Sequence, residues 1–479
     1  MPNASNNSTF NGLYRCWSVI LTESAYRPLP SVDALLRNDE VLGLIQNFPR
    51  SVITSIARDV LAEARLSIKN GGKSQSFDQL SAQIVERAKT ISQNWPNVVI
   101  NATGVILHTN LGRSPLSQRT TEAATTSASL YSDVEFSLST GKRGNRNTHI
   151  SNLIAQVTES NAGIAVNNNA AGVLLTLAAI AGDEQVKSEV IVSRGESVEI
   201  GGGFRIPDVM RQSGANLVEV GTTNRTYASD YESAISSKTA AILKVHPSNF
   251  TVDGFTHTPE LKEVVAVGKR HGVPVLNDLG SGCLIDTHQY GLAQEPQVQS
   301  SISDGATLTL FSGDKLIGGP QAGLIAGEQK WVDLVSKHPL ARAVRIDKVT
   351  LSAISATLRA YLTGTYEKEI PIWNMISINE SVLADRAETW RSKTGVGTVE
   401  RSTSTIGGGS LPGQTLPTSV LSIDPPGSAQ NFVRCLRESP VAVVARIENN
   451  RIMLDPRTVF PDQDNAVIEA IKFALNKCE

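Results

Sequence analysis

The chain has 479 residues, 40% of them hydrophobic and 19% charged, with a formal net charge of −2. This composition is typical of a globular protein, and the length predicts two to four domains of about 100–200 residues each. The near-neutral charge excludes a protein that binds nucleic acid through a strongly basic composition alone. No apolar run approaches the roughly 18 residues that a membrane-spanning helix needs, so we expect no membrane association.

The cysteines and the N-terminus both predict a cytoplasmic location. The four cysteines are scattered, with no C-x-x-C pair, which indicates reduced thiols of a cytosolic protein rather than a disulfide framework. Residues 1–25 are polar and lack the basic and apolar regions of a secretory signal. We expect these residues to form a poorly ordered tail.

Residues 26–96 have the pattern of a small helical domain. A first helix is expected from Ser51 to just before Asn70–Gly71, because apolar residues recur there at helical spacing. Ser76 and Gln79 then form a capping-box pattern ahead of a second amphipathic helix.

From residue 97 to residue 370, strand and helix patterns alternate. Short apolar strands are expected within "GIAV", "SEVIVSRG", "ANLVEVG", "AAILKVHP", "VPVLNDLGSG", "GATLTLF" and "QAGLIAG". This alternation predicts a mostly parallel sheet covered by helices on both faces. Ligands bind beyond the carboxyl ends of the strands in such sheets, so we expect Asn167–Asn169, Asp278 and Ser312–Lys315 to converge at one edge.

Residues 371–479 are predicted to form a smaller α+β domain. A stretch rich in glycine and proline, residues 403–423, is followed by a hairpin pattern that turns at Asn449–Asn450. The apolar spacing of residues 464–477 predicts a closing helix.

Lys315 lies among small residues directly after an apolar strand. A lysine removed from water has a lowered pKa, and its neutral amine can form a Schiff base with an aldehyde; otherwise Lys315 caps the strand and reaches solvent. Asp278, at the end of another strand, can keep a pyridine nitrogen protonated or simply close a turn before Gly280. The helix start in "NNNAAG", together with Ser312, can bind a phosphate or form a plain turn. In this chain order, a phosphate loop, a carboxylate and a lysine indicate a site for pyridoxal phosphate.

Other kinds of site are excluded because their motifs are missing. The sequence contains no G-x-x-x-x-G-K-[ST] phosphate loop, no G-x-G-x-x-G after a strand and no H-E-x-x-H. Its seven histidines do not cluster at metal-ligand spacing, so we expect no metal. His246 follows a strand and either lines the site or is a satisfied loop histidine.

Long motifs resemble those of the bacterial selenocysteine synthase family, the L-seryl-tRNA(Sec) selenium transferases. They are "RPLPSVDALL", "INATGVILHTNLGRSPL", "YSDVEFSLSTGKRGNRNTH", "EIGGGFRIPDVM", "EVGTTNRT", "KVHPSNF", "NDLGSG" and "FSGDKLIGGPQAG". The resemblance extends from about residue 26 to "LDPRTVFP" near the C-terminus. It implies an α/β fold of pyridoxal phosphate fold type I, like aspartate aminotransferase, for the large domain at 97–370. The helical domain at 26–96 and the small α+β domain at 371–479 flank that domain in the sequence.

The resemblance also implies roles for individual residues. The catalytic residues would be Lys315, which carries the cofactor, and Asp314 beside it. The cofactor-binding residues would be Lys315, Asp278, Ala170, Ala171 and Ser312. The substrate-binding residues would be Arg113, Arg342 and Arg345, for the phosphate of the selenium donor, and Thr222 and Thr223, which line the site between subunits. A guanidinium group can bind two oxygens of a phosphate at once through two parallel hydrogen bonds. Arg342 and Arg345 could otherwise lie on a solvated helix face.

The family further implies substrates and an assembly. Its members remove water from the seryl group of seryl-tRNA(Sec) and add selenium from selenophosphate, which gives selenocysteinyl-tRNA(Sec). They form a homodecamer, a ring of dimers, and the helical domain at 26–96 grips the tRNA. Near-neutral charge then requires recognition of the tRNA by shape, shared over several subunits.

Two other functions stay open at this point. A pyridoxal phosphate lyase acting on a free amino acid or an amino sugar phosphate would clamp its substrate carboxylate, which Arg446 could do. Such a lyase would have little use for residues 26–96. A non-catalytic RNA-binding scaffold with a decayed site would bind no cofactor at Lys315.

Overall fold

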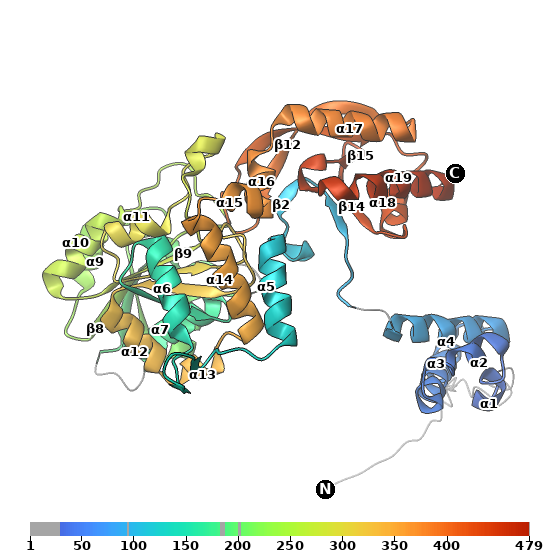
Figure 1. Ribbon diagram of the computed structural model, residues 1–479, viewed down its shortest axis with the longest axis horizontal. Coiled ribbons are helices and arrows are strands. Elements are labelled where there is room, and N and C mark those ends of the chain that lie inside the picture. Colours follow the sequence, from blue (N-terminus) through green and yellow to red (C-terminus); the bar gives the residue numbers. More distant parts are fainter. Residues whose placement is uncertain (1–28, 93–94, 183–186, 200–202, 479) are drawn as a thin grey trace, which may run out of the picture. The chain divides into compact units, whose positions relative to one another are not determined.

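The computed structural model describes residues 29–92, 95–182, 187–199 and 203–478. The chain divides into two compact units, residues 1–97 and residues 98–479 (Figure 1). The predicted tail, residues 1–25, lies outside the described residues. The expected division of the second unit near residue 370 remains a prediction. Among the described residues, no helix has the length and apolar character needed to cross a membrane.

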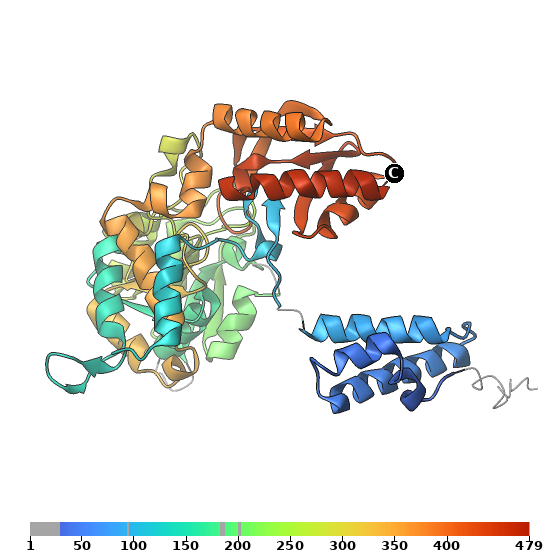
Figure 2. The same cartoon turned by 45° about the vertical axis from the view of Figure 1, so that its right-hand side comes forward.

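The first unit consists of helices that pack around one apolar core (Figures 1 and 2). The helices are α1 (Val32–Leu35), α2 (Asp39–Leu44), α3 (Arg50–Lys69) and α4 (Phe77–Ser92). Buried residues of α3 and α4, such as Ile53, Val60 and Ile84, recur at helical spacing and face each other. The predicted capping box is confirmed: the Ser76 N–H donates to Gln79 Oε1 (2.9 Å), and the Gln79 N–H donates to Ser76 Oγ (3.2 Å).

The second unit contains a seven-stranded, mostly parallel sheet, as predicted. Its strands are β5 (Ala162–Val166), β6 (Glu189–Ser193), β7 (Asn216–Val220), β8 (Thr239–Val245), β9 (Val275–Gly280), β10 (Leu308–Ser312) and β11 (Gly323–Gly327). Their order is β5-β11-β10-β9-β8-β6-β7, and only β11 runs antiparallel to its neighbours. The parallel strands β10, β9, β8, β6 and β7 therefore end at the same edge of the sheet.

Helices cover both faces of this sheet. The helices in this part of the chain are α5 (Gln118–Ser129), α6 (Asn147–Thr158), α7 (Asn169–Ala181), α8 (Ile206–Ser213), α9 (Ala228–Ala234), α10 (Leu261–His271), α11 (Val298–Ser303), α12 (Gln329–Lys337), α13 (Leu340–Ala343), α14 (Lys348–Leu362) and α15 (Tyr366–Glu369). In β11, Ile325 belongs to an apolar cluster that includes residues of α7, α8 and α12, whereas Leu324 and Ala326 belong to another that includes residues of α6 and α14. Successive side chains of a strand point to opposite faces, so the prediction of a sheet covered on both faces is confirmed.

A second sheet of six strands lies in the C-terminal part of this unit. Its order is β1 (Ile100–Ala102), β14 (Val443–Glu448), β15 (Arg451–Leu454), β13 (Thr415–Ile423), β12 (Thr398–Gly407) and β2 (Val105–Leu107). Its helices are α16 (Pro371–Ser377), α17 (Glu380–Thr394), α18 (Ala429–Arg437) and α19 (Asp464–Cys478), drawn in orange and red in Figure 2. The predicted hairpin between β14 and β15 is confirmed, and Asn449 and Asn450 have the positive φ angles of its turn (49° and 61°).

One sequence assignment needs correction. We expected residues 97–107 within the large domain, but β1 pairs with β14 and β2 pairs with β12, so both strands belong to the C-terminal sheet. The partners lie 300 or more residues away in the chain, and a local sequence pattern carries no information about such a pairing. A short hairpin, β3 (Phe136–Ser137) and β4 (Lys142–Arg143), completes the strands described.

Candidate active site

Lys315 lies in the turn that follows β10, and only 6% of its surface is exposed. The backbone of two glycines closes around its amine: a Cβ on Gly409 would lie 2.6 Å from Lys315 Nζ, and one on Gly280 would lie 3.8 Å from it. Burial, followed by the charge of the nearby Arg113 guanidinium, lowers the pKa of Lys315, while three carboxylates oppose that shift. The expectation of a buried amine at this position is confirmed.

Asp278 lies near the end of β9, the strand next to β10, and is 2% exposed. Its Oδ1 accepts hydrogen bonds from Asn169 Nδ2 (2.8 Å) and from the Gly280 N–H (3.2 Å). Burial raises the pKa of this carboxyl, and the hydrogen bond from Asn169 and the charge of Lys315 oppose that shift. Asp278 is therefore a buried carboxylate with neutral hydrogen-bond donors, and a cation placed beside it would be stabilised.

Helix α7 begins beside these two residues, because Asn169 in its first turn reaches Asp278. The Asn168 side chain caps the helix by accepting the Ala171 N–H (2.8 Å), so this N–H already has a protein acceptor. Ser312 is buried at the end of β10 and pairs with Gly323, whose missing Cβ leaves room for the Asn168 backbone. The structure thus gathers the start of α7 and Ser312 at the predicted edge.

Arg113 and Asp314 form an ion pair, with 2.7 Å between Arg113 Nη1 and Asp314 Oδ2. Asp314 is buried next to Lys315 in sequence, and its charge acts on the Lys315 amine. Arg113 adopts a positive φ of 63°, unusual for a residue with a side chain. The two residues come from segments 200 residues apart, and the structure brings both to the surroundings of Lys315.

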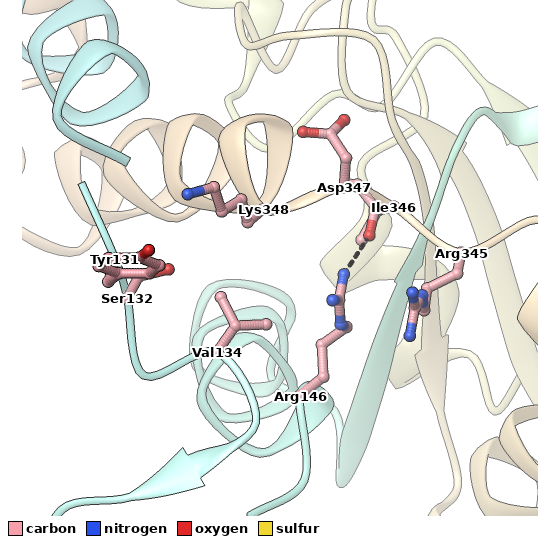
Figure 3. Close-up of a pocket in the computed structure, with 8 residues that line it drawn as sticks. All are labelled: Tyr131, Ser132, Val134, Arg146, Arg345, Ile346, Asp347 and Lys348. Carbon is pink, nitrogen blue, oxygen red and sulfur yellow. Dashed lines mark hydrogen bonds between the residues drawn. The ribbon is translucent and has the colours of Figure 1, made fainter. Parts of the chain in front are cut away.

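Arg345 and Arg342 lie in a segment next to the start of α7. Arg345 Nη1 lies 3.2 Å from Glu135 Oε1 and lines a cavity of about 410 Å³, in which the Arg146 side chain lies beside it (Figure 3). Arg342 belongs to α13 and lines a second cavity, of about 610 Å³, with Arg345. The segment adjoins the start of α7, because the Asn167 N–H donates to Val344 O (2.9 Å) and Arg345 bridges to β5.

Thr222 and Thr223 follow β7, the edge strand of the large sheet. Thr222 Oγ1 closes a turn, accepting the Arg225 N–H (3.1 Å) and donating to Arg225 O (3.0 Å). Strands are spaced about 4.8 Å apart, and β7 is four strands from β10, so the two threonines lie roughly 19 Å across the sheet from the end of β10. Within one chain they share the edge with Lys315 but not its immediate surroundings.

Sequence reasoning missed a set of buried polar atoms near Lys315 and Asp278. The atoms Asn169 Oδ1, His246 Nε2, Ser248 Oγ and Glu295 Oε1 are buried without a protein hydrogen-bond partner. His246 follows β8, and its Nε2 lies 3.4 Å from Glu295 Oε1. Buried polar groups are normally paired, so this cluster fits a polar ligand. No local signal marks Glu295 in the loop "GLAQEPQV", whereas His246 was visible only as a residue after a strand.

Comparison with known proteins identifies the family. The family model described as L-seryl-tRNA selenium transferase matches residues 99–460, and the one described as selenocysteine synthase N terminal matches residues 26–65. The chain belongs to the L-seryl-tRNA(Sec) selenium transferase family. It is 43% identical over 457 residues to the enzyme of that name from Alkaliphilus oremlandii, covering 92% of this chain and 97% of the relative. It is 44% identical over 457 residues to that of Geobacter sulfurreducens, covering 93% and 98%.

Among solved structures, the chain is similar to one described as D-glucosaminate-6-phosphate ammonia-lyase. The TM-score is 0.57 at 20% identity, and the match covers 81% of this chain and 98% of that one. At this identity the similarity concerns the fold alone. The predicted class, a large α/β domain of pyridoxal phosphate fold type I with C-terminal α+β and N-terminal helical parts, is confirmed.

Pyridoxal phosphate is the cofactor of this transferase family, and the residues around Lys315 fit it. Lys315 would carry its aldehyde carbon, and Asp278 would hold its ring nitrogen. The start of α7 and Ser312 would hold its phosphate. Gly409 and Gly280 have no side chain, so they leave free the space beside Lys315 that a Cβ would fill. The buried polar atoms without a protein partner supply further hydrogen-bonding groups.

Arg446 does not offer a free guanidinium for a substrate carboxylate. Its Nη1 donates to Thr103 O (2.6 Å) and Asp455 Oδ2 (3.2 Å), its Nε to Glu448 Oε1 (2.6 Å) and its Nη2 to Ser402 Oγ (2.8 Å). All three nitrogens are therefore already engaged by protein acceptors. This observation disfavours the lyase alternative that assigned Arg446 to a free amino acid.

Proposed function

We propose that this chain converts seryl-tRNA(Sec) to selenocysteinyl-tRNA(Sec), with selenium supplied by selenophosphate. One observation carries the proposal: the Lys315 amine and the Asp278 carboxylate are both buried where the neighbouring strands β10 and β9 end. It occurs in a chain that aligns over 97–98% of the length of relatives named for this activity. A decayed scaffold would have no reason to keep both buried charges.

Each residue at the sheet edge has a task in this reaction. Bound pyridoxal phosphate withdraws electrons from the seryl Cα and so makes the Cα proton acidic. Lys315 takes that proton, because its lowered pKa favours the neutral amine, and gives a proton to the departing β-hydroxyl. Asp278 holds a proton on the ring nitrogen. Ala170 and Ala171 at the start of α7, with Ser312, bind the phosphate, which replaces the Asn168 side chain as the acceptor of the Ala171 N–H.

Arginine side chains bind the selenium donor in this proposal. Arg113, Arg342 and Arg345 take the phosphate of selenophosphate, because guanidinium forks match phosphate oxygens. Asp314 keeps the Arg113 side chain in place through their 2.7 Å ion pair. The hydrogen bond of Asn167 to the segment before Arg345 supports a donor site next to the start of α7.

A second copy of the chain completes the site in this proposal. Thr222 and Thr223 are four strands from Lys315 within one chain, so they serve the site of a neighbouring subunit. The assembly is a homodecamer, a ring of dimers, in the cytoplasm. The helical unit at 26–96 binds the tRNA so that its seryl end reaches Lys315.

The test is turnover of acyl-tRNA against turnover of free serine. The protein with added pyridoxal phosphate is incubated with selenophosphate and either seryl-tRNA(Sec) or serine, and the amino acid released from the tRNA is identified by mass spectrometry. We expect selenocysteine from seryl-tRNA(Sec), none from free serine, and none with Lys315→Ala, whose fold is checked by circular dichroism. Turnover of free serine without turnover of seryl-tRNA(Sec) would overturn the proposal.

A further inference from the structure

The loop that follows β12, residues 408–413 with the sequence GGSLPG, lies on the Lys315 side chain. A Cβ added to Gly409 would lie 2.6 Å from Lys315 Nζ and 2.8 Å from Cε, and Gly409 has a positive φ of 85°. Only glycine combines this backbone conformation with such a close approach. The backbone of this loop therefore covers the amine on which the reaction depends.

The conformation of the loop is strained at Leu411. This buried leucine has a φ of 48°, in the left-handed region that branched side chains avoid. Its backbone N–H donates to Glu295 Oε2 (3.3 Å). Glu295 is 2% exposed, and its own N–H donates to Thr287 Oγ1 (3.0 Å). A fixed, buried carboxylate thus holds the strained residue of the loop.

The other oxygen of Glu295 faces the reaction centre. Glu295 Oε1 has no hydrogen-bond partner and lies 3.4 Å from His246 Nε2, which is also unpaired. The His246 N–H donates to Asp278 O (2.8 Å). Burial and the charge of Arg113 lower the pKa of the Lys315 amine, and the charge of Glu295 opposes that shift together with those of Asp278 and Asp314. Glu295 accordingly touches the loop with one oxygen and the surroundings of Lys315 with the other.

We propose that Glu295 is a positioning residue for the transferase reaction, which holds the 408–413 loop over Lys315 and keeps the amine shielded from water. This inference rests on the proposed function for its chemistry. A lysine that must accept a proton needs a dry environment, because water stabilises its charged form. The hydrogen bond from the Leu411 N–H to Glu295 fixes the loop. The negative charge of Glu295 limits how far burial lowers the pKa of the Lys315 amine.

Two variants separate these roles. Glu295→Gln keeps an oxygen that can accept the Leu411 N–H but removes the charge, whereas Glu295→Ala removes both. The first measurement is hydrogen exchange of the 408–413 peptide, followed by mass spectrometry, on the full chain with pyridoxal phosphate. Loss of the acceptor itself predicts exchange at the Leu411 amide that is about tenfold faster in Glu295→Ala. In Glu295→Gln the exchange stays near that of the wild type.

The second measurement is the pH titration of the absorbance band of lysine-bound pyridoxal phosphate. Both variants lack the negative charge, so both midpoints move to lower pH than that of the wild type, a shift that a purely structural role for Glu295 would not produce. Unchanged exchange in Glu295→Ala, or an unchanged midpoint in Glu295→Gln, would overturn the inference. Neither measurement uses tRNA, so these outcomes are independent of whether seryl-tRNA(Sec) is the substrate. If Glu295→Ala fails to fold, the midpoint of Glu295→Gln decides.

Discussion

Replacing Gly409 by alanine should displace the Lys315 amine. The new Cβ would lie 2.6 Å from Nζ and 2.8 Å from Cε, whereas carbon contacts are normally about 3.5–4.0 Å. The amine must therefore move by about 1 Å, and a misplacement of this size lowers catalytic rates roughly 100-fold. The left-handed backbone adds strain of about 1 kcal/mol for any residue other than glycine. We expect a kcat roughly 100-fold below that of the wild type with little change in KM for seryl-tRNA(Sec).

The matched control is Gly413→Ala in the same loop. Gly413 also has a positive φ (74°), but an added Cβ there would meet no atom within 4 Å. This variant carries the backbone strain without the contact and should keep a kcat close to that of the wild type. The assay is steady-state formation of selenocysteinyl-tRNA(Sec), with borohydride trapping of pyridoxal phosphate on Lys315 as a second readout. Wild-type kcat in Gly409→Ala, or equal losses in both variants, would refute the reasoning.

Two further predictions concern buried charges. Lys244 donates to Glu196 Oε1 at 2.9 Å, and both side chains are about 90% buried, so Lys244→Met should lower the free energy of unfolding by about 3–5 kcal/mol. Urea denaturation measures this loss, which the double variant with Glu196→Gln should largely recover; a loss under about 1 kcal/mol would contradict the burial argument. Burial raises the pKa of Asp278 above its usual 3.8, so the cofactor-free protein should lose stability as the pH rises through that raised pKa. Asp278→Asn should then raise the midpoint temperature of unfolding at pH 7 while it abolishes turnover. Calorimetry over a pH series measures this, and a midpoint at pH 7 below that of the wild type would contradict the argument.

Local patterns in the sequence predicted much of the fold. Helical and strand periodicities located the elements of the large sheet, and the capping box at Ser76 and Gln79 formed as predicted. Asn449–Asn450 marked a hairpin turn that the structure contains. These features depend on the conformational preferences of neighbouring residues, and adjacent residues are what a sequence displays directly.

The surroundings of Lys315 were only partly predictable. Lys315, Asp278 and Ser312 stand at strand ends, and the rule that parallel strands end at one edge brought them together. Glu295 stands in a loop with no motif, and its importance comes from contacts with Leu411 and His246. Arg446 looked available in the sequence, yet protein acceptors engage all of its nitrogens in the folded chain.

The sequence by itself determined the main elements of the large sheet, the placement of Lys315, Asp278 and Ser312 near strand ends, and the family, because these follow from local residue order and from long matching motifs. Only the tertiary structure decided that β1 and β2 join the C-terminal sheet and that a glycine-rich loop covers Lys315. It also decided that a buried glutamate holds that loop. The physical reason is that burial and hydrogen bonding between distant segments depend on how the chain packs, which residue order specifies only through the complete fold.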